Sequence, residues 1–230
     1  MYLSHFIGAS TPTFGNKGGL SISKSRSMCD GCSTNEMRID MQNHIGTHVD
    51  APYHFDEQGK KLTDYSADFW VCRNILLVDL QGIAHNQLID LALWQALAPP
   101  IDEGTDLLLI RTGFEKYRAN QSDESPYIFK GPGLHPDLCE YFRKTTTIRM
   151  LGFDFISLTA FAHREPGRIA HRMLLGPLDR DAIPFTREPI LILEDMSLRH
   201  LEGSPKMVVI APLMIENADG GPVTAFAYSH

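Results

Sequence analysis

Residues 43–55 read NHIGTHVDAPYHF and contain three of the ten histidines of the chain. His44, His48, Asp50 and His54 all occupy even positions in this stretch. Because alternate residues of an extended chain point to the same side, a strand here would carry three imidazoles and a carboxylate on one face. The stretch therefore predicts a strand with a polar face that is rich in metal-ligating groups.

The residues just before this stretch alternate in the same phase. Over 36–42, Met and Ile occupy odd positions and polar side chains occupy even ones, which predicts a half-buried strand. A helix is the alternative, because His44 and His48 have the four-residue spacing of His-Glu-x-x-His zinc sites. Gly46 and Pro52 disfavour a helix, and the Glu of that motif is absent, so the extended interpretation is favoured.

Imidazole and carboxylate groups together form the ligand set of zinc, manganese and ferrous iron. One histidine alone is more often a hydrogen-bonded surface residue, but these four groups within 11 residues would compete for partners without a cation. The segment therefore predicts a divalent-cation site. A cation held by three protein groups keeps a position open for water and lowers the pKa of that water to about 7, so such a site is suited to hydrolysis.

Outside this segment, short apolar runs alternate with helical patterns. Buried strands are predicted at 73–80, 106–111, 148–153, 189–193 and 207–210. Apolar residues recur at helical spacing over 88–97, before two prolines, and again after Pro136. This alternation predicts a mixed α/β fold. The segments 120–136 and 176–188 are rich in polar residues, Pro and Gly, and are predicted to be surface loops.

The composition fits one globular domain that spans residues 1–230. Hydrophobic residues make up 43% and charged residues 21%, which excludes a disordered or fibrous chain. The formal net charge is −7 and there is no basic block, so neither nucleic acid nor an anionic membrane is an expected partner. No run approaches the ~18 apolar residues of a membrane span, and the N-terminus does not resemble a secretory signal. We therefore expect a cytoplasmic protein.

Four cysteines, Cys29, Cys32, Cys72 and Cys139, are too few and too scattered for a disulfide-scaffolded domain. Cys29 and Cys32 have the spacing of a redox pair or of half a zinc knuckle. No second pair in the sequence matches them, so a reduced loop is the favoured hypothesis.

The pattern His-x-Gly-Thr-His-x-Asp-x-Pro-x-His over residues 44–54 resembles the signature of the cyclase family of metal-dependent hydrolases, which includes bacterial kynurenine formamidases and isatin hydrolases. Seven fixed positions within 11 residues carry this resemblance. Further segments similar to family landmarks are Leu3-Ser4-His5, Arg111-Thr112-Gly113, Gly152-Phe153-Asp154 and Ala218-Asp219-Gly220. The resemblance therefore extends over nearly the whole sequence.

This resemblance implies a swivelling β/β/α fold with a mixed central sheet, assembled as a homo-oligomer, either a dimer or a tetramer. It implies that His44, His48 and Asp50 hold one divalent cation, Zn²⁺ or Mn²⁺. Asp50 would also bridge to a second cation, whose remaining ligands would be His171 and Glu194. The family spaces this His and Glu more closely, which indicates an insertion between them here.

The resemblance gives His54 the catalytic place, as general base and then as general acid toward a leaving amine. A third metal ligand is the alternative interpretation of this residue. His163 is interpreted either as another pocket residue or as a solvent-facing histidine at the start of a helix. Tyr53, Phe55 and Trp70 are candidates to face an aryl ring or to lie in the core.

The function implied is hydrolysis of an amide or lactam C–N bond in a small-molecule substrate, such as an arylformamide or an isatin-like ring, by metal-activated water. Two alternatives stay open. One is a metal-dependent cyclase or dehydratase that acts on a polyketide-like carbonyl. The other is a non-catalytic module with a structural metal, although the number of candidate ligands argues against it.

Overall fold

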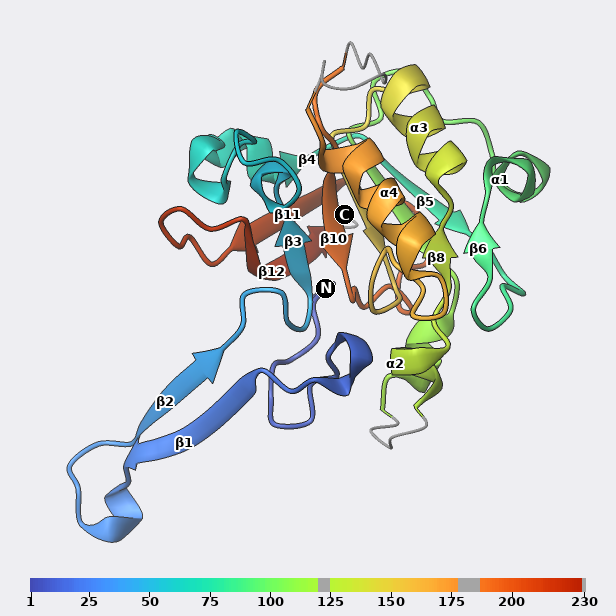
Figure 1. The fold of residues 1–230 in the computed structure, drawn as a ribbon. Coiled ribbons are helices and arrows are strands. Elements are labelled where there is room, and N and C mark those ends of the chain that lie inside the picture. Colours follow the sequence, from blue (N-terminus) through green and yellow to red (C-terminus); the bar gives the residue numbers. More distant parts are fainter. Residues whose placement is uncertain (120–124, 178–186, 229–230) are drawn as a thin grey trace.

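The computed structural model describes residues 1–119, 125–177 and 187–228. Its centre is an eight-stranded mixed sheet (Figure 1). In spatial order the strands are β4 (Val71–Cys72), β11 (Met207–Pro212), β12 (Gly220–Tyr228), β3 (His48–Asp50), β10 (Leu191–Glu194), β9 (Met150–Phe153), β7 (Leu107–Arg111) and β5 (Ile75–Asp79). The neighbours β10, β9, β7 and β5 are parallel, and the other neighbouring pairs are antiparallel. The five strands predicted from apolar runs are all present, as β5, β7, β9, β10 and β11.

The two edge strands of this sheet follow each other in the chain. Only Arg73 and Asn74 separate β4 from β5, so the sheet curls until its edges approach each other. Asp106, just before β7, holds this connection by accepting the backbone N–H groups of Arg73 (3.0 Å) and Asn74 (3.1 Å). The sheet is therefore close to a closed barrel, with an inner and an outer face.

Both faces of the sheet are apolar, because successive side chains of a buried strand enter different cores. In β7, Leu107 and Leu109 pack inside the curled sheet, whereas Leu108 and Ile110 pack beneath helices. All four side chains are fully buried. This two-sided burial explains why the predicted strands read as continuous apolar runs.

Helices α1 (Leu91–Leu97), α3 (Pro136–Thr145) and α4 (Arg164–Leu175) cover the outer face (Figure 1). The first two confirm the predicted helical patterns. The pattern over 88–97 also includes β6 (Leu88–Ile89), which pairs with β8 (Gly133–Leu134) before α1 begins. Helix α4 begins directly after His163, as the interpretation of His163 as a helix-start histidine implies, but its extent has no counterpart among the predicted elements.

The remaining helices are short. Helix α2 spans Pro126–Phe129. Short 3-10 helices are η1 (Phe14–Asn16), η2 (Met28–Asp30), η3 (Pro52–His54), η4 (Leu62–Asp64), η5 (Ala67–Trp70) and η6 (Phe114–Tyr117). Within the described ranges, no helix is both long enough and apolar enough to cross a lipid bilayer.

The prediction of a surface loop over 120–136 is wrong for residues 125–136, the part that the structure describes. Residues 125–136 contain α2 and β8, and the Tyr127 side chain is fully buried. The polar residues around this segment obscure its short apolar run, PYIF, which packs against the outer core. The rest of this loop, and most of the loop predicted over 176–188, lie outside the described ranges.

Strands β1 (Leu20–Arg26) and β2 (Glu36–Met41) form an antiparallel arm that projects from the body of the molecule (Figure 1). The register pairs Ile22 with Ile39, so the odd-numbered residues of β2 share a face with the even-numbered residues of β1. This face is mainly apolar, yet Met37 is 62% exposed and Ile39 is 51% exposed. The predicted alternation is therefore present, but the predicted half-burial is wrong, because no other part of the described chain covers the arm.

A buried arginine from α3 holds the C-terminal end of α4. Arg143 is 1% exposed and donates to the carbonyl oxygens of Met173 (3.0 Å), Leu174 (2.7 Å) and Gly176 (3.1 Å). The last carbonyls of a helix have no partner within it, so this cation satisfies them. Burial lowers the pKa of Arg143 to about 10, which leaves the guanidinium charged at neutral pH. The contact therefore fixes where α4 lies against α3.

Arg143→Met is expected to lower the free energy of unfolding by about 2–4 kcal/mol, because it leaves buried carbonyl groups without donors. Urea unfolding followed by circular dichroism measures this loss. Arg168→Met is the control, since the Arg168 side chain is 67% exposed and its ion pair with Glu165 should contribute less than about 1 kcal/mol. Equal losses in the two variants would contradict the role assigned to Arg143.

Candidate metal centre

The central strand β3 carries two of the candidate ligands, His48 and Asp50, on one face. Val49 between them packs in the inner core, so both polar side chains point to the outer, helix-covered face. The register sets His48 directly opposite Glu194 of β10. Because directly opposed residues share a face of a sheet, Glu194 joins the same group.

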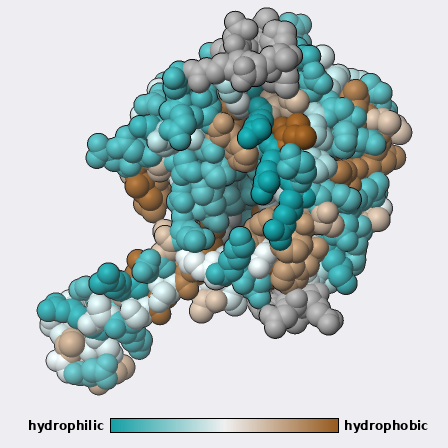
Figure 2. All heavy atoms as spheres, in the orientation of Figure 1, coloured by the Kyte–Doolittle hydropathy of each residue, from teal (hydrophilic) through white to brown (hydrophobic). Residues whose placement is uncertain are grey.

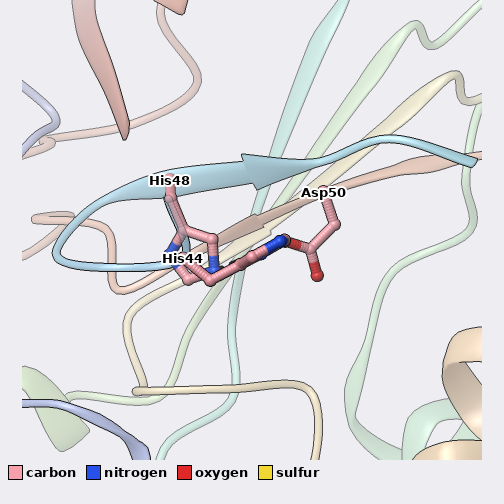
Figure 3. A group of neighbouring side chains, drawn as sticks. All are labelled: His44, His48 and Asp50. Carbon is pink, nitrogen blue, oxygen red and sulfur yellow. Dashed lines mark hydrogen bonds and ion pairs between the residues drawn. The ribbon is translucent and has the colours of Figure 1, made fainter. Parts of the chain in front are cut away.

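His44 reaches this group from the loop before β3 (Figure 3). Gly46 turns that loop with a φ of +61°, a conformation that favours glycine. His44 Nδ1 lies 2.8 Å from Asp50 Oδ1. The sequence thus predicts correctly that His44, His48 and Asp50 lie together, although the strand itself covers only His48–Asp50.

His171 reaches the group from α4. Its Nε2 atom lies 3.6 Å from Glu194 Oε1 and 3.8 Å from Asp50 Oδ2. The helix approaches closely because residue 167 is glycine: a Cβ there would lie 2.2 Å from Thr159 Oγ1. The long spacing between His171 and Glu194 in the sequence therefore does not keep them apart.

Backbone carbonyls orient two of the imidazoles. His48 Nδ1 lies 2.8 Å from the Gly46 oxygen, and His171 Nδ1 lies 2.8 Å from the Gly167 oxygen. Since a carbonyl oxygen only accepts, each Nδ1 carries the hydrogen, and each Nε2 of a neutral ring presents a lone pair. The Nε2 atom of His48 lies 3.4 Å from Asp50 Oδ1 and 3.4 Å from Glu194 Oε2.

The electrostatics of the group require positive charge. Burial by itself lowers the pKa of His48 and of His171, but hydrogen bonds and the charges of Asp50 and Glu194 outweigh it, so both pKa values are raised. Burial also lowers the pKa of His44, but the hydrogen bonds that His44 donates to Asp219 and Asp50 outweigh it and raise this pKa to about 10. Burial favours the neutral form of Asp50, yet its imidazole partners hold the pKa of this carboxyl well below its usual range.

A divalent cation fits this donor set. His48, Asp50, His171 and Glu194 are each at most 6% exposed, and acceptor atoms face one another across the group. His44, His48 and Asp50 form one group of three ligand atoms within 4.8 Å of one another, and Asp50, His171 and Glu194 form a second. Asp50 belongs to both groups. The outer nitrogens of His48 and His171 are already bonded to backbone, as is usual for metal-binding histidines.

His54 comes from η3 rather than from β3, so the predicted strand does not extend to it. Its ring lies beside that of His44, with centroids 4.1 Å apart. Its Nδ1 atom lies 2.6 Å from Asp219 Oδ2, and its side chain is 30% exposed. His54 therefore lies next to the ligand groups but is held by a carboxylate outside them.

The ligand groups and His54 line a cavity of about 290 Å³ that opens to solvent. Phe14 and Phe55 also line it, and the Phe55 ring stacks on His171 with centroids 4.9 Å apart. Trp70 lies elsewhere, in the inner core. Tyr53 contacts Lys61 and is not part of the lining. Of the three aromatic candidates, only Phe55 faces the cavity.

Asp219 also belongs to the site, although no local pattern in the sequence indicates a role for it. The only signal is its position within the segment Ala218-Asp219-Gly220, which resembles a family landmark. His163 is exposed at the N-terminus of α4, so the solvent-facing interpretation is confirmed. Cys29 and Cys32 are free and exposed in the connection between β1 and β2, and neither lines the cavity.

The chain is similar in sequence to bacterial enzymes. A family model described as a putative cyclase matches residues 1–160. A kynurenine formamidase of Bacillus cereus is 30% identical over 195 residues, which cover 84% of this chain and 79% of that protein. The kynurenine formamidase of Geobacillus thermodenitrificans is 32% identical over 201 residues, with the same coverage.

Solved structures share the fold. Isatin hydrolase A from Labrenzia aggregata, bound to benzyl benzoate, matches with a TM-score of 0.77 at 21% sequence identity. The match covers 100% of this chain and 93% of the isatin hydrolase chain. A potential metal-dependent hydrolase with cyclase activity matches with a TM-score of 0.72 at 23% sequence identity. This match covers 100% of this chain and 97% of the hydrolase chain. These likenesses confirm the predicted α/β fold with a mixed central sheet. Together with the sequence matches, they identify the chain as a member of the cyclase family.

Proposed function

We propose that this protein is a metal-dependent hydrolase that cleaves a C–N bond in a small amide or lactam. The observation that carries the proposal is the convergence of buried imidazoles and carboxylates around Asp50 at the wall of an open cavity. A structural metal is normally enclosed by its protein ligands, whereas a catalytic one faces space that a substrate can enter. The similarity to kynurenine formamidases supports an amide bond as the one cleaved.

In this proposal His44, His48 and Asp50 hold one cation, zinc or manganese, and Asp50, His171 and Glu194 hold a second. A divalent cation bound there supplies Lewis acidity, which lowers the pKa of water to about 7 and polarises a carbonyl. Glu194 is oriented for its role because it accepts the Leu158 N–H at 2.7 Å. Asp50 belongs to both groups of candidate ligands, so its carboxylate would serve both positions.

His54 acts in this proposal as the acid–base group. It lines the cavity, and the Asp219 carboxylate rather than a cation-binding group engages its Nδ1 atom. An amine is a poor leaving group unless it receives a proton, so a titratable side chain beside the ligands is required. His54 would accept a proton from the attacking water and return it to the leaving nitrogen.

The lining supports a substrate with an aryl group, such as an arylformamide or an isatin-like ring. Phe14 and Phe55 flank the cavity, and Ile156 adds an apolar surface near the ligands. Aromatic rings pack favourably against one another at offset or edge-to-face geometries. A cavity of about 290 Å³ is at the small end for ligand sites, which favours a single-ring or fused-ring substrate.

The protein should release acid from a panel of arylformamides, lactams and cyclic imides, detected with a pH indicator. A chelator should abolish this activity while the far-ultraviolet circular dichroism spectrum stays unchanged, and zinc or manganese should restore it. Unfolding upon chelation would instead support a module with a structural metal. Loss of water from a polyketide-like carbonyl substrate, without acid release from the panel, would support the cyclase or dehydratase alternative.

His54→Asn is expected to lower kcat by about 10²–10⁴-fold, because it removes the proton-transfer group. The folded protein should keep its metal content, measured by inductively coupled plasma mass spectrometry. His163→Asn is the matched control, since His163 is exposed on α4 outside the cavity lining, and it should behave as wild type. A His54→Asn variant that has lost its cation would make His54 a metal ligand instead.

We propose in addition that the chain forms a homodimer through its arm. A two-stranded ribbon is at best marginally stable alone in water, so the exposed apolar face of β1 and β2 calls for a covering layer. Figure 2 shows the arm projecting from the body with apolar and neutral residues among its hydrophilic ones. A second copy offers the same apolar face and would make a self-complementary contact.

Ile39→Glu should shift the protein from dimer to monomer in size-exclusion chromatography with light scattering, because it buries a charge in this contact. Ser23→Glu is the control: it introduces the same charge on the arm, but Ser23 pairs with Arg38 on the polar face. A monomeric wild type, or dissociation of both variants, would overturn the proposal.

We also propose a cytoplasmic location. Cys29 and Cys32 are free although both are exposed, and Cys72 and Cys139 are free and buried. Exposed thiols persist unpaired most readily in a reducing compartment.

A further inference from the structure

Asp219 lies between two histidines that have different proposed roles. Its Oδ2 atom is 3.0 Å from His44 Nε2 and 2.6 Å from His54 Nδ1. His44 is a candidate metal ligand, and His54 is the candidate acid–base group. A single carboxylate oxygen therefore contacts both parts of the site.

We propose that Asp219 is a positioning residue that fixes the tautomer of both rings at once. An ionised carboxylate only accepts hydrogen bonds, so each ring must donate to Oδ2. His44 is thereby held with hydrogen on Nε2, so Nδ1, which lies 2.8 Å from Asp50 Oδ1, is the nitrogen that would give up its hydrogen to bind a cation. His54 is held with hydrogen on Nδ1, which leaves Nε2 as the nitrogen that exchanges protons. This inference rests on the proposed hydrolase function.

The backbone around Asp219 is built to hold this carboxylate in place. The Asp219 carbonyl accepts the Ala51 N–H at 2.9 Å, and the next residue, Gly220, pairs with Asp50 in the sheet. Residue 220 must be small, since a Cβ there would lie 2.6 Å from His44 Cε1. The register of β12 against β3 therefore delivers the carboxylate to the edge of the ligand group.

The second oxygen of Asp219 is also engaged. Asn43 Nδ2 donates to Oδ1 at 2.5 Å and to the Gly220 carbonyl at 3.2 Å. With Asn43 on one oxygen and two imidazoles on the other, the carboxylate has little freedom to rotate. Hydrogen bonds of this kind to metal-binding histidines typically change metal affinity by about 10–100-fold.

A competing interpretation is that Asp219 itself binds a cation. His44, His54 and Asp219 do lie close enough together to form a third group of ligand atoms. This group is more exposed than the two around Asp50, and it would withdraw His44 from the first of them. The two interpretations differ in the number of cations that the Asp219→Asn variant binds at saturation.

The experiment compares wild type, Asp219→Asn and Glu216→Gln. Glu216 is exposed in the same connection before β12 and loses the same charge, so Glu216→Gln is the control. Zinc affinity is measured by chelator competition, and bound zinc at saturation by mass spectrometry. Side-chain ¹⁵N NMR of histidine-labelled, zinc-loaded protein reports the tautomer of His54.

Asp219→Asn is expected to weaken zinc binding by about 10–100-fold while the amount bound at saturation stays the same. The His54 signals should change from the Nδ1–H form to a mixture that includes Nε2–H. In the arylformamide assay kcat should fall by at least about 10-fold, because the His54 ring would often carry its hydrogen on the wrong nitrogen. KM should change little, because Asp219 does not bind the substrate. Glu216→Gln should match wild type in all of these measurements.

Unchanged zinc affinity together with an unchanged His54 tautomer would overturn the inference. Loss of one bound zinc at saturation would also overturn it, because Asp219 would then be a ligand. Failure of the proposed function gives a different pattern, in which wild type binds zinc but releases no acid from any substrate. In that case the affinity and tautomer measurements still decide the role of Asp219.

Discussion

The site depends on one electrostatic constraint, namely two buried carboxylates that face the Nε2 atoms of two buried imidazoles. His48 and His171 each donate their Nδ1 hydrogen to a backbone carbonyl, so their Nε2 atoms are directed toward Asp50 and Glu194. Buried carboxylates are costly unless positive charge lies beside them. Protons on the imidazoles supply such charge, as the raised pKa values of His48 and His171 indicate, and a divalent cation between the same atoms would supply more.

The fold meets this constraint by bringing distant segments to one point. Strand β3 lies at the centre of the curled sheet, and its antiparallel neighbours β10 and β12 bring Glu194 and the Asp219 connection to its two sides. Helix α4 contributes His171; Arg143 holds the C-terminal end of this helix, and Gly167 lets the helix approach the sheet closely. Four of the candidate ligands, His48, Asp50, His171 and Glu194, therefore lie on strands or on a helix, and His44 lies in the loop before β3, beside an open cavity.

Much of this could be read from the sequence because it is local. The even-numbered positions of His44, His48 and Asp50 place these groups together whether or not the whole segment is a strand. Continuous apolar runs likewise indicated strands that are buried on both faces. The positions of His171 and Glu194 came from the family resemblance, since no local pattern relates residues so far apart.

Other features could not be read because they depend on tertiary contacts. Alternation in β2 shows that one face is apolar but not whether the chain itself covers that face. The sequence does not indicate the short helix α2, because polar residues and prolines surround it. It is buried because its side chains pack against the outer core. Asp219 acts across the sheet on residues 175 and 165 positions away, so only the register of β12 reveals its role.

The most direct test of this account is a crystal structure of the zinc- or manganese-supplemented protein with anomalous data at the metal edge. The account predicts an anomalous peak among His44, His48 and Asp50, and a second peak among Asp50, His171 and Glu194 if both positions are filled. Crystals without a peak at these residues, with the imidazoles hydrogen-bonded only to the carboxylates, would contradict it.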